Sequence, residues 1–183
     1  ALGEEYSAAF PLFYGDREVS KGQIAKYVRF REVVRMFRDS GVKLVVHGSG
    51  YGYLNDYKGR LVIEGMLEEA NADPELDTCW MILGGVDVEK YIRKYRGRVD
   101  LLHLKDFKPP YEESEYVIVR QNSIENRWRE CYTAVGQDGV LDLPRVVKTA
   151  VECGTKWLIV ELWNERESLE NACVSAENIR RYL

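Results

Sequence analysis

The sequence lacks long apolar runs, blocks of basic residues and closely spaced cysteines. No run approaches the ~20 apolar residues of a membrane span, and the N-terminus lacks the basic and apolar segments of a secretory signal. The net charge of -4 and the absence of Lys or Arg clusters argue against nucleic-acid and membrane partners. The four cysteines form no CxxC pair, which favours reduced thiols in a cytoplasmic protein: Cys79, Cys131, Cys153 and Cys173.

Helical and strand-like patterns alternate along the 183 residues, a length that fits a single domain over 1–183. Apolar periodicity and end signals predict helices over about 20–41, 60–71, 86–97, 142–154 and 166–182. Short β-branched or apolar runs predict strands over 42–49, 74–80, 99–106 and 156–163. This order predicts an α/β fold with a parallel sheet. Residues 107–141 form an insertion, with room for a short hairpin, after the carboxyl end of a strand, where parallel α/β proteins build their sites.

Each predicted strand ends its apolar part with a residue able to ligate a metal: His47, Asp77, His103 and Glu161. Both histidines of the chain are among them. Side chains alternate across a strand, so His103 and Lys105 share a face while Asp106 points to the other. Such a convergence of imidazole and carboxylates suits a divalent cation. A strand histidine is more often a packed residue and a lone carboxylate a helix cap, so spacing leaves both interpretations open.

Several motifs resemble the sugar phosphate isomerase/epimerase family, whose members have a xylose isomerase-like TIM barrel. They are 77-DTCW-80, 84-GGVDVEKYIRKYRGR-98, 103-HLKD-106 and 135-VGQDGVLDLPRVVKTAVECGTKWLIVE-161. The resemblance implies a partial (β/α)8 barrel, namely its C-terminal half with about strands five to eight. A whole barrel takes roughly 200 residues or more, so we expect an N-terminally truncated domain that either forms a homodimer or joins a complementing N-terminal half.

The resemblance also implies a site and a reaction. Asp77, His103 and Glu161 match the family's metal ligands, and the expected ion is Mn, Mg, Co or Zn. Glu161 and Lys105 are the expected catalytic residues, for metal-assisted isomerisation or epimerisation of a ketose, keto-inositol or sugar phosphate. The expected substrate-binding residues are His47, Trp80, Lys105 and Asp106.

Two departures from the family pattern support other functions. Gly52 stands where the family has its first glutamate ligand, and Leu162-Trp163 replaces a common Gln-Asp pair. A two-base epimerisation would be lost with that glutamate. The chain could therefore be a degenerate, non-catalytic barrel fragment or binding module. A metal-dependent endonuclease of the same barrel type is disfavoured, because it needs more histidine and acidic ligands for three metals.

Overall fold

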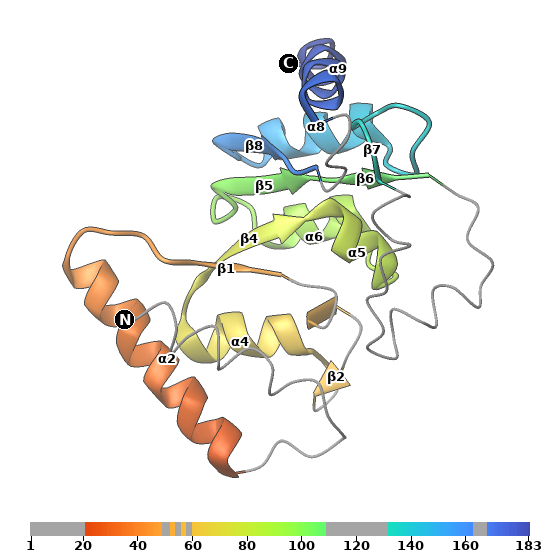
Figure 1. Cartoon of the computed structure of the whole chain (residues 1–183). Helices are drawn as coiled ribbons and strands as arrows, with labels where there is room; N and C mark the ends of the chain where they lie inside the picture. Colours follow the sequence, from red (N-terminus) through yellow and green to blue (C-terminus); the bar gives the residue numbers. More distant parts are fainter. Residues whose placement is uncertain (1–20, 49–51, 54–55, 58–59, 109–131, 163–167) are drawn as a thin grey trace.

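The computed structural model describes residues 21–48, 52–53, 56–57, 60–108, 132–162 and 168–183. The five predicted helices and four predicted strands occur in the predicted order, and further short elements lie between them (Figure 1). The helices are α2 (Lys21–Asp39), α4 (Val62–Ala70), α5 (Thr78–Leu83), α6 (Val88–Lys94), α8 (Leu143–Glu152) and α9 (Ser168–Arg180). The strands are β1 (Val45–His47), β2 (Asp56–Tyr57), β3 (Arg60–Leu61), β4 (Asp73–Asp77), β5 (Leu101–Leu104), β6 (Asp106–Phe107), β7 (Tyr132–Thr133) and β8 (Trp157–Val160).

Four strands form one parallel sheet in the order β1-β4-β5-β8, which confirms the predicted α/β class. In the register, His47 lies opposite Glu75, Asp77 opposite His103, and Leu104 opposite Val160. Within the described residues, β1 and β8 each pair with a single neighbour. The sheet is therefore an open arc, as a half barrel requires.

The two faces of this sheet differ in burial. Val46, Leu76, Leu102 and Leu104 are at most 2% exposed and belong to a core that also includes apolar residues of α4, α6 and α8. The alternate residues of the strands are mostly half-buried, and Trp157 is 65% exposed. This second face would line the interior of a barrel. It also carries the residues at the strand ends.

One predicted strand is too long. The run 74–80 was expected to be extended throughout, but β4 ends at Asp77 and α5 begins at Thr78. The Asp77 carboxylate is the reason, because its Oδ1 accepts a hydrogen bond from the Trp80 amide at 3.0 Å. An aspartate in this position caps the first turn of a helix.

The helix from Leu143 begins and ends as the sequence indicates. The Asp142 side chain accepts from the Arg145 amide, a proline lies in the first turn, and Gly154 follows the helix with a positive φ of 84°. That φ suits glycine because it has no Cβ.

The predicted insertion 107–141 begins shortly after β5 ends at Leu104. A short antiparallel ribbon of β6 and β7 lies at its base, pairing Asp106 with Thr133 and Phe107 with Tyr132. Residues 109–131 lie outside the described part, so a hairpin within them stays a prediction. None of the described helices has both the length and the apolar character needed to cross a bilayer. The thiols of Cys79, Cys153 and Cys173 are free.

Candidate metal centre

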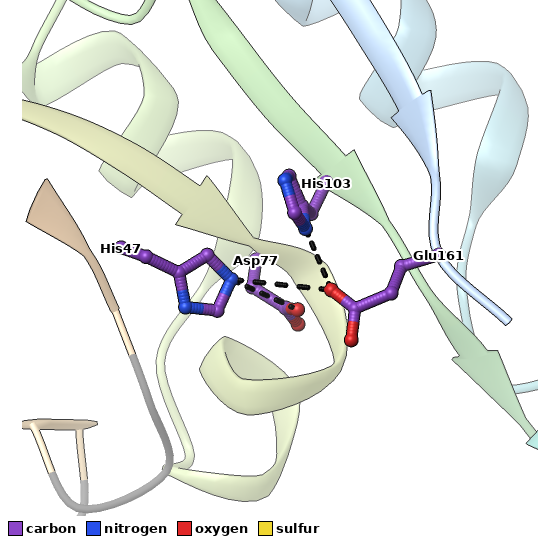
Figure 2. A group of neighbouring side chains, drawn as sticks. All are labelled: His47, Asp77, His103 and Glu161. Atoms are coloured by element: carbon purple, nitrogen blue, oxygen red, sulfur yellow. Dashed lines mark hydrogen bonds and ion pairs between the residues drawn. The ribbon is translucent and has the colours of Figure 1, made fainter. Parts of the chain in front are cut away.

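The four residues at the strand ends converge on one point at the carboxyl edge of the sheet (Figure 2). His47 ends β1, Asp77 ends β4, His103 lies in β5, and Glu161 follows β8. One ligand atom from each lies within 4.8 Å of the corresponding atoms of the other three. Their register and the period of two in a strand place all four side chains on the barrel-interior face. The sequence predicted three of them as ligands, and the structure adds His47 to the group.

The imidazole of His103 is held between two carboxylates. Its Nδ1 is 2.6 Å from Glu161 Oε2, and its Nε2 is 2.6 Å from Glu75 Oε1. The hydrogen bond to Glu161 is the main reason why the pKa of His103 is raised, and it outweighs the opposing effect of burial. In the absence of a cation, this ring therefore favours the imidazolium form more than an ordinary histidine does.

Glu161 connects the group to a buried lysine. Its Oε1 accepts a hydrogen bond from Lys105 Nζ at 2.7 Å, while its Oε2 faces His103. Burial raises the pKa of Glu161, but the hydrogen bonds from His103 and Lys105 outweigh it and hold the pKa at about 2. The carboxylate is consequently ionised throughout the neutral range, as a metal ligand must be.

His47 and Asp77 each present a buried polar atom that makes no hydrogen bond to the described residues. These atoms are His47 Nε2 and Asp77 Oδ2. They face each other at 3.7 Å, and His47 Nε2 is 4.0 Å from Glu161 Oε2. Asp77 is fully buried, and its other oxygen caps α5. Buried polar atoms are rarely left unsatisfied in proteins. A divalent cation between these atoms would satisfy both, so the residues present fit a metal ion.

Lys105 is fully buried and lies beside this group. Its Nζ is 5.3 Å from the ring centroid of Trp80 and 4.8 Å from that of Tyr132. The Thr78 hydroxyl accepts from the Lys105 amide and donates to the Lys105 carbonyl, each at 2.9 Å. The two rings and the threonine fix the side chain and backbone of Lys105, so its ammonium group is directed at Glu161. The partly buried Trp80 thus lies beside Lys105 and also packs against the core.

Asp106 lies apart from the group and organises a loop. Its carboxylate accepts hydrogen bonds from the amides of Phe107, Gly136 and Leu141, at 2.9 to 3.1 Å. Burial raises the pKa of Asp106, and these amides oppose the rise. Gly139 is needed here because a Cβ on it would lie 2.1 Å from the carboxylate. The predicted substrate contact by Asp106 stays a prediction, whereas its contacts to the 136–141 loop are direct.

Gly52, which stands where the family has its first glutamate ligand, offers no ligand atom. A Cβ on Gly52 would lie 3.1 Å from Ile63 Cβ in α4. It would therefore be directed at the core. His47, at the end of β1, offers a ligand atom from this part of the chain.

Two further residues beside the group were not predicted to belong to the site. Glu75 could have been found, since it lies two residues before Asp77 on the same strand and therefore shares its face. Tyr132 could not, because it is 27 residues beyond Lys105 and reaches it only through the pairing of β6 with β7.

Among known proteins, the chain matches solved structures. No protein-family model matches the chain, and no curated protein does. A sugar phosphate isomerase/epimerase from Parabacteroides distasonis matches with a TM-score of 0.61 and 19% identity, over 89% of this chain and 54% of that one. A probable 3-DHS dehydratase from Bacillus anthracis matches with a TM-score of 0.65 and 11% identity, over 89% and 58%. An L-ribulose 3-epimerase matches with a TM-score of 0.55 and 16% identity, over 92% and 55%.

These matches agree with the predicted half barrel. The chain spans a little over half the length of the structures that it matches, and its parallel sheet is an open arc of four strands. At identities below 20%, the comparisons establish the fold and leave the reaction open. The predicted fold is thus confirmed: the chain has the fold of about half of the TIM barrels that it matches, among them a sugar phosphate isomerase/epimerase and a xylose isomerase domain protein.

Proposed function

We propose that this chain carries the metal centre of a sugar isomerase or epimerase. The observation that carries the proposal is the convergence of two imidazoles and two carboxylates from four parallel strands, with two of their buried atoms otherwise unsatisfied. His47, Asp77, His103 and Glu161 would hold the ion. Bound there, a divalent cation would polarise the carbonyl of a ketose, keto-inositol or sugar phosphate and so favour enolisation.

The nature of the ligands narrows the choice of metal. Carboxylates suit Mg and Mn, whereas imidazole favours transition metals and zinc. The group has two imidazoles and two carboxylates and is mostly half-buried, which favours Mn, Co or Zn over Mg. We expect Zn to bind more tightly than Mn, because affinity for nitrogen and oxygen sites generally rises in that order.

We propose that Glu161 removes a proton from the substrate carbon and that Lys105 stabilises negative charge on a substrate oxygen. The Oε2 atom of Glu161 faces the ligand group, which leaves Oε1 as the atom that would accept a proton from the substrate carbon. A pKa of about 2 makes this carboxylate a weak base while Lys105 holds it. A substrate oxygen could accept the hydrogen bond of the Lys105 ammonium in place of Glu161. Glu161 would then become a stronger base, and the ammonium would stabilise negative charge on the substrate oxygen. Trp80, whose ring lies beside Lys105, would flank the bound substrate.

A metal titration tests the proposal. Wild-type protein freed of metal with EDTA should bind close to one equivalent of Zn²⁺ or Mn²⁺ in isothermal titration calorimetry. His103→Ala should bind at least tenfold more weakly, since a ligand is lost. Equal binding by the two proteins would contradict the assignment. Arg145→Ala, on an exposed side chain of α8, is a suitable control.

A non-catalytic binding module is the second candidate, and Gly52 favours it. The described residues include no second glutamate at the position where the related enzymes have one, and the Cβ direction at Gly52 points to the core. Incubation with a panel of ketoses in D₂O, followed by NMR, separates the two candidates. Deuterium incorporation next to the carbonyl supports the enzyme, whereas metal binding without exchange supports the binding module.

We also propose that a complementing half barrel covers the inner face of the sheet. Parallel sheets normally have both faces covered, yet Val45, Leu101 and Ile159 are only half-buried on this face and Trp157 is largely exposed. The matched structures have further chain of nearly the same length. A second copy of this chain fits the inner face less well. A barrel closed by two copies would bring two groups of the four candidate ligands to the same end.

Light scattering of the purified chain tests this choice. We expect the 21.2 kDa monomer, or irregular association through the exposed face. A discrete dimer that binds metal tightly would show instead that two copies close the barrel.

A further inference from the structure

Glu75 makes a contact that the proposed ligand group does not explain. It lies on β4 two residues before Asp77, and its Cα is the register partner of His47. Its Oε1 is 2.6 Å from His103 Nε2, and the two side chains are 18% and 17% exposed. A short contact between half-buried groups of this kind fixes the plane and position of the imidazole ring.

The two nitrogens of His103 face different surroundings. Nδ1 is on the side of Glu161, whose Oε2 in turn lies 4.0 Å from His47 Nε2. Nε2 faces Glu75, which is not a member of the group of four. A histidine that ligates a metal through one ring nitrogen usually donates the N–H of the other to a carboxylate or carbonyl. The arrangement therefore suits metal ligation through Nδ1 and a hydrogen bond to Glu75 through Nε2.

We propose that Glu75 is a positioning residue of the metal centre. It accepts a hydrogen bond from Nε2–H of His103 and so retains the proton on Nε2, and a cation would displace the proton of Nδ1 and bind that nitrogen. The negative charge of Glu75 also makes Nδ1 a stronger donor to the metal. This inference rests on the proposed function and concerns how His103 serves it.

Three variants test the inference by metal affinity. Glu75→Ala removes the hydrogen bond, and loss of such a partner lowers metal affinity about 10- to 100-fold. Glu75→Gln retains an oxygen that accepts from Nε2–H but lacks the charge, so its affinity should lie between those of wild type and Glu75→Ala. Asp73→Ala is the matched control, since Asp73 lies on the same strand and face but pairs with Lys43 and Arg98. Its affinity should stay within about threefold of wild type.

Imidazole ¹⁵N NMR of the Zn²⁺-loaded protein provides a second measurement that a purely structural role would not change. The chain has only two histidines, so each ring can be assigned with a single substitution. The wild-type spectrum should show His103 with a proton on Nε2 and the metal on Nδ1. Glu75→Ala should show a mixture of tautomers or the reversed one.

The outcomes separate this inference from the proposed function. No Zn²⁺ or Mn²⁺ binding by the wild type would overturn both. Metal binding that is equal in wild type and Glu75→Ala, or a spectrum with the proton on Nδ1 in the wild type, would overturn the role of Glu75 alone. If circular dichroism shows that Glu75→Ala is unfolded, Glu75→Gln and the wild-type spectrum decide the question.

Discussion

Replacing Lys105 by methionine tests how strongly the buried ammonium group stabilises Glu161. Methionine retains most of the apolar stem but removes the charge. It also removes the hydrogen bond to Glu161 at 2.7 Å and the two contacts with the rings of Trp80 and Tyr132. Glu161 would keep its hydrogen bond with His103.

The expected loss follows from the pKa of Glu161. A drop from 4.5 to about 2 corresponds to an upper limit of about 3.5 kcal/mol, at about 1.4 kcal/mol for each pKa unit. Glu161 is partly exposed, and His103 supplies part of the shift, so the share of Lys105 is about 1–2 kcal/mol. Loss of the ring contacts adds about 0.5–1 kcal/mol.

The pH dependence has a definite sign. The folded-state pKa of Glu161 lies below its unfolded value, so its charge stabilises the fold above pH 4.5. This stabilisation is lost as pH falls from 4.5 toward 2. The difference in stability between wild type and Lys105→Met should therefore be largest near pH 7 and shrink toward pH 3.

Urea unfolding in EDTA at several pH values measures this difference. Lys43→Met is the matched control. Like Lys105, Lys43 forms ion pairs with carboxylates, in its case Asp73 and Asp100, but its side chain is 40% exposed. Lys43→Met should lower the free energy of unfolding by less than about 1 kcal/mol at pH 7. A Lys105→Met loss that is no larger than this, or that stays constant from pH 7 to pH 3, would refute the reasoning.

The Asp106 carboxylate should contribute more to stability than a simple helix cap does. Asp106→Ala leaves the buried Leu141 amide and the less buried Gly136 amide without their acceptor, which should cost about 2–4 kcal/mol in urea unfolding. Asp142→Ala removes one exposed cap of α8 and should cost about 1 kcal/mol. Equal losses in the two variants would mean that the buried loop contacts are no stronger than the surface cap.

Much of the fold was determined by local features of the sequence. The alternation of apolar runs with helical periodicity was sufficient to predict the parallel sheet, and Asp142 with Gly154 marked the ends of α8. The period of two in a strand also placed His103 and Lys105 on one face. These features are readable because each depends on residues only a few positions apart.

The tertiary structure decided how the strands meet and which atoms face one another. Register across strands brought His47 level with Glu75 and Asp77 level with His103, and no local pattern specifies that register. The early end of β4 is by contrast a local feature that the sequence prediction missed, because the Asp77 carboxylate caps α5 through an amide only three residues further on. The placing of Tyr132 against Lys105 depended on the pairing of two strands separated by a long insertion. The sequence thus determined the kinds of ligand available, whereas contacts between distant segments determined their arrangement, because only the folded chain fixes distances between residues far apart in sequence.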